Sequence, residues 1–264
     1  MTFLRETYRH SAWSANLFLG HPGLWVWRQG FEKWGEDSPR AMMGHVIEDI
    51  VSLYFYWGEF SFADLLDIPL IAKSWFLAIF YKEARRHWMN STHGLIDDEM
   101  DNVAPIALNM LIELDQWNFG KFIAAQVRTP KDALPQFKGL NTPCRATVDL
   151  MFEAGDIDLK ATLRCPSEPS ANHLRQMALY ALLRGRPQWL LYATPKRARM
   201  FEVHPSDVVH YGQQVLDAFR QIERLNRRYE RVKSLTALYP LNPDDFQWDN
   251  PEEYQEARKV WDAS

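Results

Sequence analysis

The chain has 264 residues, of which 47% are hydrophobic and 24% charged, and its formal net charge is −4 at pH 7. This length allows one large domain with a sizeable core, and two cysteines provide no disulfide framework. The first ten residues, MTFLRETYRH, are charged and unlike a signal peptide, and the apolar runs are far shorter than the ~20 residues that cross a bilayer. We therefore expect a cytoplasmic enzyme with no membrane partner.

Hydrophobic periodicity predicts helices first and a sheet afterwards. The strands flank a helix over residues 171–184, so the sheet should be parallel or mixed in that part, with helices on both faces. The predicted helices are Ser11–Leu19, Pro39–Trp57, Leu70–Met89, Val103–Val127, Ala171–Arg184 and Asp207–Lys233, and the predicted strands are Phe137–Lys138, two within Arg145–Thr162, Trp189–Ala193 and Ala198–Val203.

Two segments on either side of Ala154 and Gly155 alternate apolar and polar residues, as do strands with one apolar face. We expect a hairpin in which Gly155 supplies a positive φ in the turn. Both apolar faces must point into one core, so residue 152 is predicted to oppose 157, 150 to oppose 159, and 149 to oppose 160. In this register Asp149, Asp158 and Lys160 share the opposite face.

Two carboxylates on adjacent strands repel each other, and divalent cations between them would relieve that repulsion. Such hard oxygen ligands suit Mg²⁺ or Mn²⁺. The alternative is a solvent-facing strand pair in which Asp158 and Lys160 form an ion pair without catalysis.

Further residues around this hairpin carry a resemblance to a known family. In chain order, the residues are His45, Asp149, Asp158-x-Lys160 and Gln176-x-x-x-Tyr180. This pattern resembles the RecB-type nucleases of the PD-(D/E)XK superfamily, which include CRISPR adaptation nucleases and stand-alone phage exonucleases. The opening segment, Ser11-Ala-Trp-Ser14 followed by His21-Pro22, is also similar to that family's.

The resemblance implies a role for each of these residues. The metal would be bound by His45, Asp149, Asp158 and the backbone carbonyl of Leu159, with Glu48 as a weaker outer ligand. It also implies that Lys160 orients or activates the attacking water and offsets charge on the phosphate, and that Gln176 and Tyr180 contact the DNA backbone or steady the site. As separate signals, His45 fits a hydrogen-bonded histidine at a helix start, and Gln176 and Tyr180 fit the edge of the core equally well.

Two departures limit the resemblance. Ala146 stands where the family usually has a glycine. Several relatives also bind an iron–sulfur cluster with four cysteines, one of them in a Cys-Pro pair that His21-Pro22 replaces here. With only Cys144 and Cys165 in the chain, a four-thiolate cluster cannot form, so we expect no iron–sulfur cluster.

The net charge is negative, whereas DNA binding needs a basic surface. Residues 181–233 contain eleven Lys and Arg against five Asp and Glu, so this region is locally basic. Within it, four arginines recur at helical spacing and are predicted to contact DNA, unless they are an ordinary solvated face with pairs such as Glu223 to Arg227. They are Arg220, Arg224, Arg227 and Arg231.

The predicted organisation is one nuclease domain over residues 1–233, with residues 58–130 as a helical insertion or arch. Residues 234–264 form an acidic extension with seven Asp and Glu against two Lys and Arg. This extension is predicted either to be a loosely attached tail that docks a partner or competes with DNA, or to pack on the domain through a helix over 251–261.

We therefore expect an α/β fold with a PD-(D/E)XK core, a mixed central sheet flanked by helices and a helical insertion. The predicted activity is metal-dependent DNA exonuclease chemistry in phage or bacterial recombination, repair or replication, inside a bacterial host cell. The chain has no phosphate-binding ATPase motif, so it would act alone or with separate recombination or replication proteins. The alternatives are a structure-selective or restriction-like endonuclease and a catalytically silent DNA-binding or protein-binding module.

Overall fold

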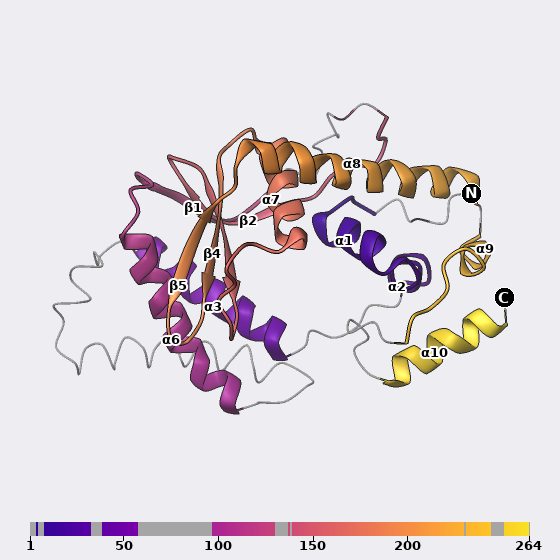
Figure 1. Ribbon diagram of the computed structural model, residues 1–264, viewed down its shortest axis with the longest axis horizontal. Helices are drawn as coiled ribbons and strands as arrows, with labels where there is room; N and C mark the ends of the chain where they lie inside the picture. The colour runs from indigo at the N-terminus through magenta and orange to yellow at the C-terminus, as the bar shows by residue number, and fades with distance from the viewer. Residues whose placement is uncertain are drawn as a thin grey trace.

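A five-stranded mixed sheet forms the centre of the protein, with helices on both faces (Figure 1). The computed structural model describes residues 4, 8–32, 39–57, 97–129, 137, 139–229, 231–243 and 251–263. The strand order is β1-β2-β3-β4-β5, and only the β3–β4 pair is parallel. The predicted α/β class and mixed sheet are thus confirmed. The strands are β1 (Phe122–Arg128), β2 (Thr147–Phe152), β3 (Asp156–Ala161), β4 (Gln188–Ala193) and β5 (Ala198–Glu202).

Each face of the sheet has its own hydrophobic core. On one face, α3 (Pro39–Trp57) and α6 (Asp97–Asp115) pack against Leu150, Ile157 and Leu191. On the other, α7 (Ala171–Arg184) lies against the sheet and α8 (Pro205–Arg228) covers it, with Leu190 and Tyr192 in the same core (Figure 1). The remaining elements are α1 (Ala12–Gly20), α2 (Pro22–Trp25), the π-helix η1 (Val26–Gly30), α9 (Lys233–Thr236) and α10 (Pro251–Asp262).

The crossover helix α7 has clear signals at both ends. Ser170 is the N-cap, and its hydroxyl accepts a hydrogen bond from the His173 N–H at 3.3 Å. Gly185 ends the helix in the left-handed conformation at φ 63°, which a residue without a Cβ adopts at low cost. These signals explain why the predicted range of 171–184 is confirmed. The parallel pairing of β3 with β4 follows from this crossover.

The β2–β3 hairpin differs from the predicted register by two residues. Leu150 opposes Ile157 and Met151 opposes Asp156, because the Phe152 N–H bonds the Gly155 carbonyl at 2.9 Å and closes a shorter loop. A shift of two residues preserves the predicted alternation of faces across the hairpin. Continuing this register places Asp149 opposite Asp158, where the prediction placed it opposite Lys160.

Gly155 is required for a reason other than the one predicted. Its φ is not positive. A Cβ at this position would lie 2.3 Å from Trp189 Cζ3 and 2.4 Å from the Pro187 carbonyl oxygen. Glycine is therefore needed because β3 passes close to the chain that enters β4.

The predicted helix over 103–127 is wrong in its second half. Helix α6 ends at Asp115, and residues 122–128 form the edge strand β1, which pairs with β2. Between them Gly120 takes φ 70°, which turns the chain toward the sheet. The predicted helix Leu70–Met89 and most of the predicted insertion lie outside the described residues.

Two other predicted elements also differ. Helix α8 ends at Arg228, whereas the prediction ended it at Lys233. Tyr229 is extended, and Val232 packs so closely against Gly30 of η1 that a Cβ on Gly30 would lie 2.1 Å from Val232 Cγ2. This tertiary contact takes the chain out of the helical path. Phe137 lies in a bend outside any strand, and Lys138 is outside the described residues.

The carboxyl-terminal helix α10 packs on the amino-terminal part of the chain. Ala257 is fully buried, and the rings of Trp261 and Trp27 have centroids 6.3 Å apart. Arg28 donates to Glu253 at 2.9 Å. Of the two predictions for the acidic extension, the packed helix is confirmed. Across the described part of the chain, no helix is both long and apolar enough to cross a membrane.

Candidate metal-dependent active site

Asp149, at the middle of β2, is a buried carboxylate held by the neighbouring strand. Its Oδ2 accepts a hydrogen bond from the Leu159 N–H at 2.7 Å, and Gln126 Nε2 of β1 lies 3.5 Å from its Oδ1. Only 7% of the residue is exposed. The carboxylate is thus oriented by the two strands that flank β2.

Asp158, on β3, is more deeply buried, with 1% of the residue exposed. Its Oδ1 accepts a hydrogen bond from Gln176 Nε2 of α7 at 2.8 Å. Lys160 Nζ forms an ion pair with the other oxygen, Oδ2, at 2.5 Å, and the Lys160 side chain is 20% exposed. The lysine therefore links the buried carboxylate to the surface.

The two carboxylates lie in a setting that disfavours their charged forms. Burial raises the pKa of Asp149 well above its usual value, and the charges of Asp158 and Glu48 raise it further. Burial also raises the pKa of Asp158, although Lys160 opposes this effect. Without a cation, the folded protein therefore carries two carboxyl groups in a place that disfavours their charged forms.

Lys160 remains a cation in this setting. Burial acts to lower its pKa, but the charges of Asp158 and Asp149 outweigh burial and raise the pKa above the usual range. A lysine in this state cannot accept a proton from water at neutral pH. It can offset negative charge and hold an oxygen ligand by hydrogen bonding.

The two α3 residues predicted as metal ligands, His45 and Glu48, differ in solvent exposure. His45 is 59% exposed, and its Nδ1 lies 3.5 Å from Glu48 Oε2. Glu48 is half-buried, and its charge acts on both Asp149 and Asp158. Glu48, predicted as the weaker ligand, is therefore the α3 residue whose charge raises the pKa of both aspartates.

The donor set fits a hard divalent cation in part. Asp149 and Asp158 supply buried carboxylate oxygens, and Asp158 Oδ2 accepts no hydrogen bond of regular geometry. A cation there would offset the negative charges that, together with burial, raise both pKa values. Within the described ranges, however, no three His, Cys, Asp or Glu side chains come together as a metal site. The predicted set with His45 is therefore not preassembled.

Gln176 and Tyr180 lie on one face of α7 and connect the carboxylates to a cavity. Gln176 Nε2 donates both to Asp158 and to the Tyr180 hydroxyl, the latter at 2.9 Å. Burial and the charge of Asp158 raise the pKa of Tyr180, so its hydroxyl stays protonated. Both side chains line a cavity of about 720 Å³ that Trp13, Arg145 and residues at the start of α7 also border.

Sequence reasoning missed Gln126, which faces Asp149 across the β1–β2 pair. Its φ is 51°, which is unusual for a residue with a Cβ, in a strand that also has a register shift between Phe122 and Ala124. The missing signal was the strand itself, because residues 122–127 were predicted as the end of a helix. The unusual backbone of Gln126 thus lies directly beside Asp149.

His173 and Tyr192 were also missed. The His173 Nδ1 and the Tyr192 hydroxyl are 2.5 Å apart, and Tyr192 pairs with Lys160 in the β3–β4 register. Burial and the charge of Lys160 lower the pKa of His173 to about 4, so the ring is neutral at pH 7. Their position follows from the parallel register, which the sequence pattern does not specify.

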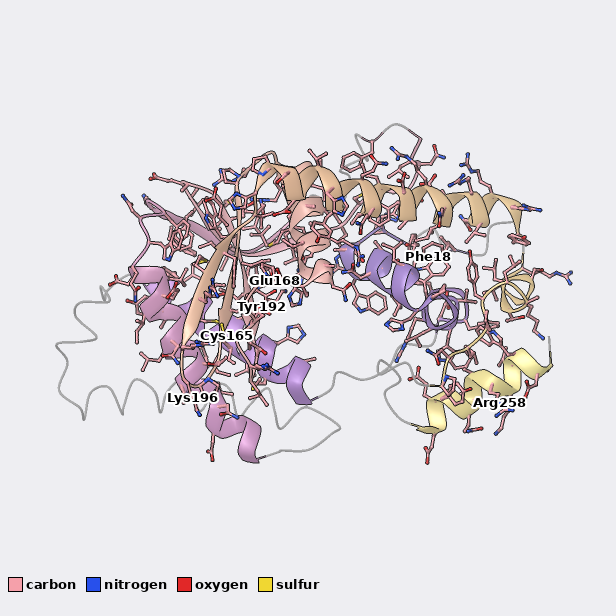
Figure 2. All side chains as sticks on the ribbon, viewed as in Figure 1. Phe18, Cys165, Glu168, Tyr192, Lys196 and Arg258 are labelled. Atoms are coloured by element: carbon pink, nitrogen blue, oxygen red, sulfur yellow. The ribbon has the colours of Figure 1, made fainter. Side chains whose placement is uncertain are left out.

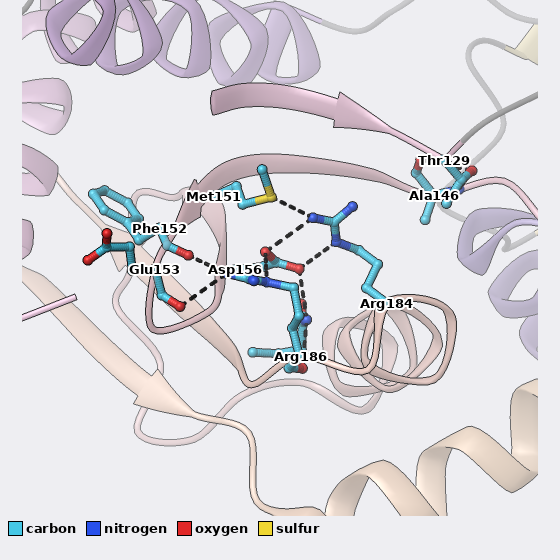
Figure 3. Close-up of polar contacts among 9 residues, drawn as sticks. Thr129, Ala146, Met151, Phe152, Glu153, Asp156, Arg184 and Arg186 are labelled. Carbon is cyan, nitrogen blue, oxygen red and sulfur yellow. Dashed lines mark hydrogen bonds and ion pairs between the residues drawn. The ribbon is translucent and has the colours of Figure 1, made fainter. Parts of the chain in front are cut away.

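Asp156, two residues before Asp158 on the same face, has a different role. Arg184 and Arg186 converge on its carboxylate (Figure 3), with Nε–Oδ distances of 2.5 and 3.1 Å, and Gln188 Nε2 donates at 3.1 Å. Asp156 is fully buried. Its charge is thus compensated by the end of α7 and the start of β4, so this carboxylate has a structural role.

The arginines predicted to bind DNA lie on and after α8, which packs on α7 and α1. Arg220 forms an ion pair with Asp217 at 2.7 Å, and Arg227 Nε donates to the Glu223 carbonyl at 3.3 Å. Glu223 itself is buried and accepts backbone N–H groups of Asn141 and Thr142, so it is not part of a solvated pair. Arg231 follows the end of the helix. None of the four lines the cavity beside Tyr180.

Comparison with known proteins assigns no family to the chain. No family model matches it, and no curated protein matches. Among solved structures, the crystal structure of SSO0001 covers 73% of this chain and 81% of its own, with 16% sequence identity and a TM-score of 0.34. A score of this size establishes neither a shared core nor a function.

Proposed function

We propose that the protein is a metal-dependent deoxyribonuclease that hydrolyses phosphodiester bonds at the carboxylate pair of strands β2 and β3. The observation that carries this proposal is the buried pair Asp149 and Asp158 on adjacent strands, with Lys160 on the same face. A buried carboxylate pair destabilises the cation-free protein, and a bound divalent cation would compensate its negative charge.

Asp149 and Asp158 would hold Mg²⁺ or Mn²⁺, with the Leu159 carbonyl, Glu48 and His45 as further ligands. Bound there, the cation would lower the pKa of a coordinated water and withdraw charge from the phosphate. Lys160, kept protonated by the two aspartates, would stabilise charge that develops on the phosphate oxygens. Gln176 would keep Asp158 in place through its hydrogen bond.

The cavity beside Tyr180 is large enough for a nucleotide, since small-molecule sites are typically ~300–1,000 Å³. Its lining combines an exposed aromatic side chain, Trp13, with the guanidinium of Arg145 and the amides of Asn172 and Gln176. We propose that a strand end enters here, which corresponds to exonuclease action.

The decisive experiment measures cleavage with Mg²⁺ or Mn²⁺ on linear DNA, labelled separately at each end, and on closed circles. An exonuclease degrades linear DNA and leaves circles intact, whereas cleavage of circles would indicate an endonuclease. Asp158→Asn should lower the rate at least ~100-fold. Asp156→Asn is the matched control, because it removes a buried carboxylate from the same strand face. No cleavage by the wild type with either metal would favour a silent binding module.

Cation binding can be measured without activity. Because both pKa values are raised, loading the site should release protons. Calorimetric titration with Mn²⁺ in two buffers of different ionisation enthalpy should therefore give different apparent heats for the wild type. The Asp149→Asn variant should lose this difference, and equal heats in the wild type would contradict the proposed ligand pair.

A further inference from the structure

A second hollow lies beyond the carboxyl ends of the parallel strands β3 and β4. It has a volume of about 830 Å³ and is formed by the segment after β3 and the β4–β5 turn. Cys165 and Lys196, both labelled in Figure 2, lie on its two sides. We call it the basic groove. Its lining residues are Leu163, Arg164, Cys165, Pro166, Ser167, Thr194, Lys196, Arg197 and Arg199.

The charge of the basic groove is of one sign. Its lining holds four cationic side chains, Arg164, Lys196, Arg197 and Arg199, and no carboxylate. All four residues are exposed, and none forms an ion pair with another described residue. Like charges held together without counterions raise the local potential, so this surface attracts a polyanion. The surface is notable in a chain whose net charge is −4.

The basic groove continues from the candidate active site along the same strand. Arg164 lies four positions after Lys160, which at ~3.3 Å per residue is at most ~13 Å. In the neighbouring strand Tyr192 pairs with Lys160, and Thr194, two residues later, lines the groove. Ligands of α/β sheets bind outside the carboxyl ends of parallel strands, where this groove lies.

We infer that the basic groove binds the sugar–phosphate backbone of DNA to one side of the bond that is cleaved. This inference rests on the proposed nuclease function and adds the path of the substrate to it. Each strand of duplex DNA has one phosphate per ~3.4 Å of helix axis, so the distance from Lys160 to Arg164 corresponds to the axial rise of roughly three or four nucleotides. The contacts are to phosphates, so the groove adds affinity without base specificity.

The first test neutralises the groove. The triple variant Lys196→Gln, Arg197→Gln, Arg199→Gln should bind DNA with a salt dependence reduced by roughly two to three units in log K against log salt. At 150 mM salt it should raise KM at least ~10-fold and leave kcat within ~2-fold. The matched control, Lys233→Gln, Arg258→Gln, Lys259→Gln, removes three exposed positive charges elsewhere and should change neither quantity. Equal effects of both triples, or none of the groove triple, would overturn the inference.

The second test uses Cys165 as a reporter. It lines the groove, whereas Cys144 is buried and burial with the charge of Glu223 raises its pKa to about 12, so alkylation should report Cys165 alone. In EDTA, a single-stranded oligonucleotide of ten or more nucleotides should slow alkylation by iodoacetamide at least ~5-fold, and a mononucleotide should not. Cys165→Ser confirms which thiol reacts. Unchanged alkylation with saturating oligonucleotide would refute the groove as a DNA contact.

The failure of either proposal can be recognised separately. Cleavage that depends on Asp158 but is indifferent to the groove triple would remove the groove and keep the nuclease. DNA that protects Cys165 in a protein without cleavage in Mg²⁺ or Mn²⁺ would remove the nuclease and keep the groove as a DNA-binding surface.

Discussion

The substitution Asp156→Asn separates a structural carboxylate from a catalytic one on the same strand. Asp156 and Asp158 are both buried, both point to the α7 side of the sheet and both contact cationic side chains. Asp156 is held by three partners, Arg184, Arg186 and Gln188. We therefore expect its loss to lower stability and to leave the chemistry of the folded enzyme unchanged.

The magnitude follows from the contacts of Asp156. Breaking a buried ion pair by removing one partner costs ~3–5 kcal/mol, since the remaining charge is left without compensation. The side chains of Arg184 and Arg186 are 14% and 29% exposed, so both can turn toward water, which favours the lower end, about 3 kcal/mol. In a domain of this size that corresponds to a Tm lower by about 6–12 °C.

The assay pairs thermal and denaturant unfolding in EDTA with cleavage at a temperature well below both transitions. Asp156→Asn should unfold earlier and cleave at the wild-type rate per folded molecule. Asp158→Asn should lose cleavage but unfold within about 1 kcal/mol of the wild type, because the lost ion pair with Lys160 is offset by the removal of a negative charge beside Asp149. A stable Asp156→Asn protein without activity, or an active Asp158→Asn protein, would refute the division of roles.

Three further predictions concern stability. Burial raises the pKa of Asp149, so the folded state holds a proton there and the stability of the wild type should fall as pH rises through that raised pKa. The Asp149→Asn variant should lose this pH dependence, and its Tm at pH 8 should be about 2–4 °C above that of the wild type. A variant with a lower Tm than the wild type at pH 8 would contradict this prediction. Burial lowers the pKa of His10 from 6.5 to about 4, so the neutral ring contributes stability above pH 6.5 that is lost as pH falls toward 4. In denaturant titrations over that pH range, the free energy of unfolding of the wild type should fall by about 3 kcal/mol more than that of His10→Phe. Parallel pH curves for the two proteins would exclude this role. Gly155→Ala should cost about 1–3 kcal/mol in urea unfolding because the added methyl meets Trp189 and the Pro187 carbonyl, and a neutral result would indicate that these groups can move.

The sequence alone determined which face of the hairpin each charged residue occupies. Apolar residues at every second position had to reach one core, so Asp149, Asp158 and Lys160 were confined to the other face whatever the loop length, provided its parity held. The N-cap Ser170 and the glycine after Arg184 likewise defined α7, because capping depends on a few consecutive residues.

Local patterns could not decide which residues of that face oppose one another. A shift of two residues preserves the alternation, so only the closed loop at Phe152 and Gly155 placed Asp149 opposite Asp158 and left Lys160 beside Tyr192. The strand β1 was hidden for a similar reason, since its short apolar run also fits a helix.

Tertiary structure also decided which charges are compensated. Asp156 and Asp158 are both buried aspartates on the same face of β3. Asp156 contacts two arginines, from the end of α7 and the segment before β4, whereas Asp158 contacts one lysine of its own strand and lies near other carboxylates. Electrostatic environment depends on groups far apart in the chain. The sequence therefore determined the face on which the charged residues lie. The fold determined which of these charges are left without a compensating partner, because Coulomb energy depends on distance in space.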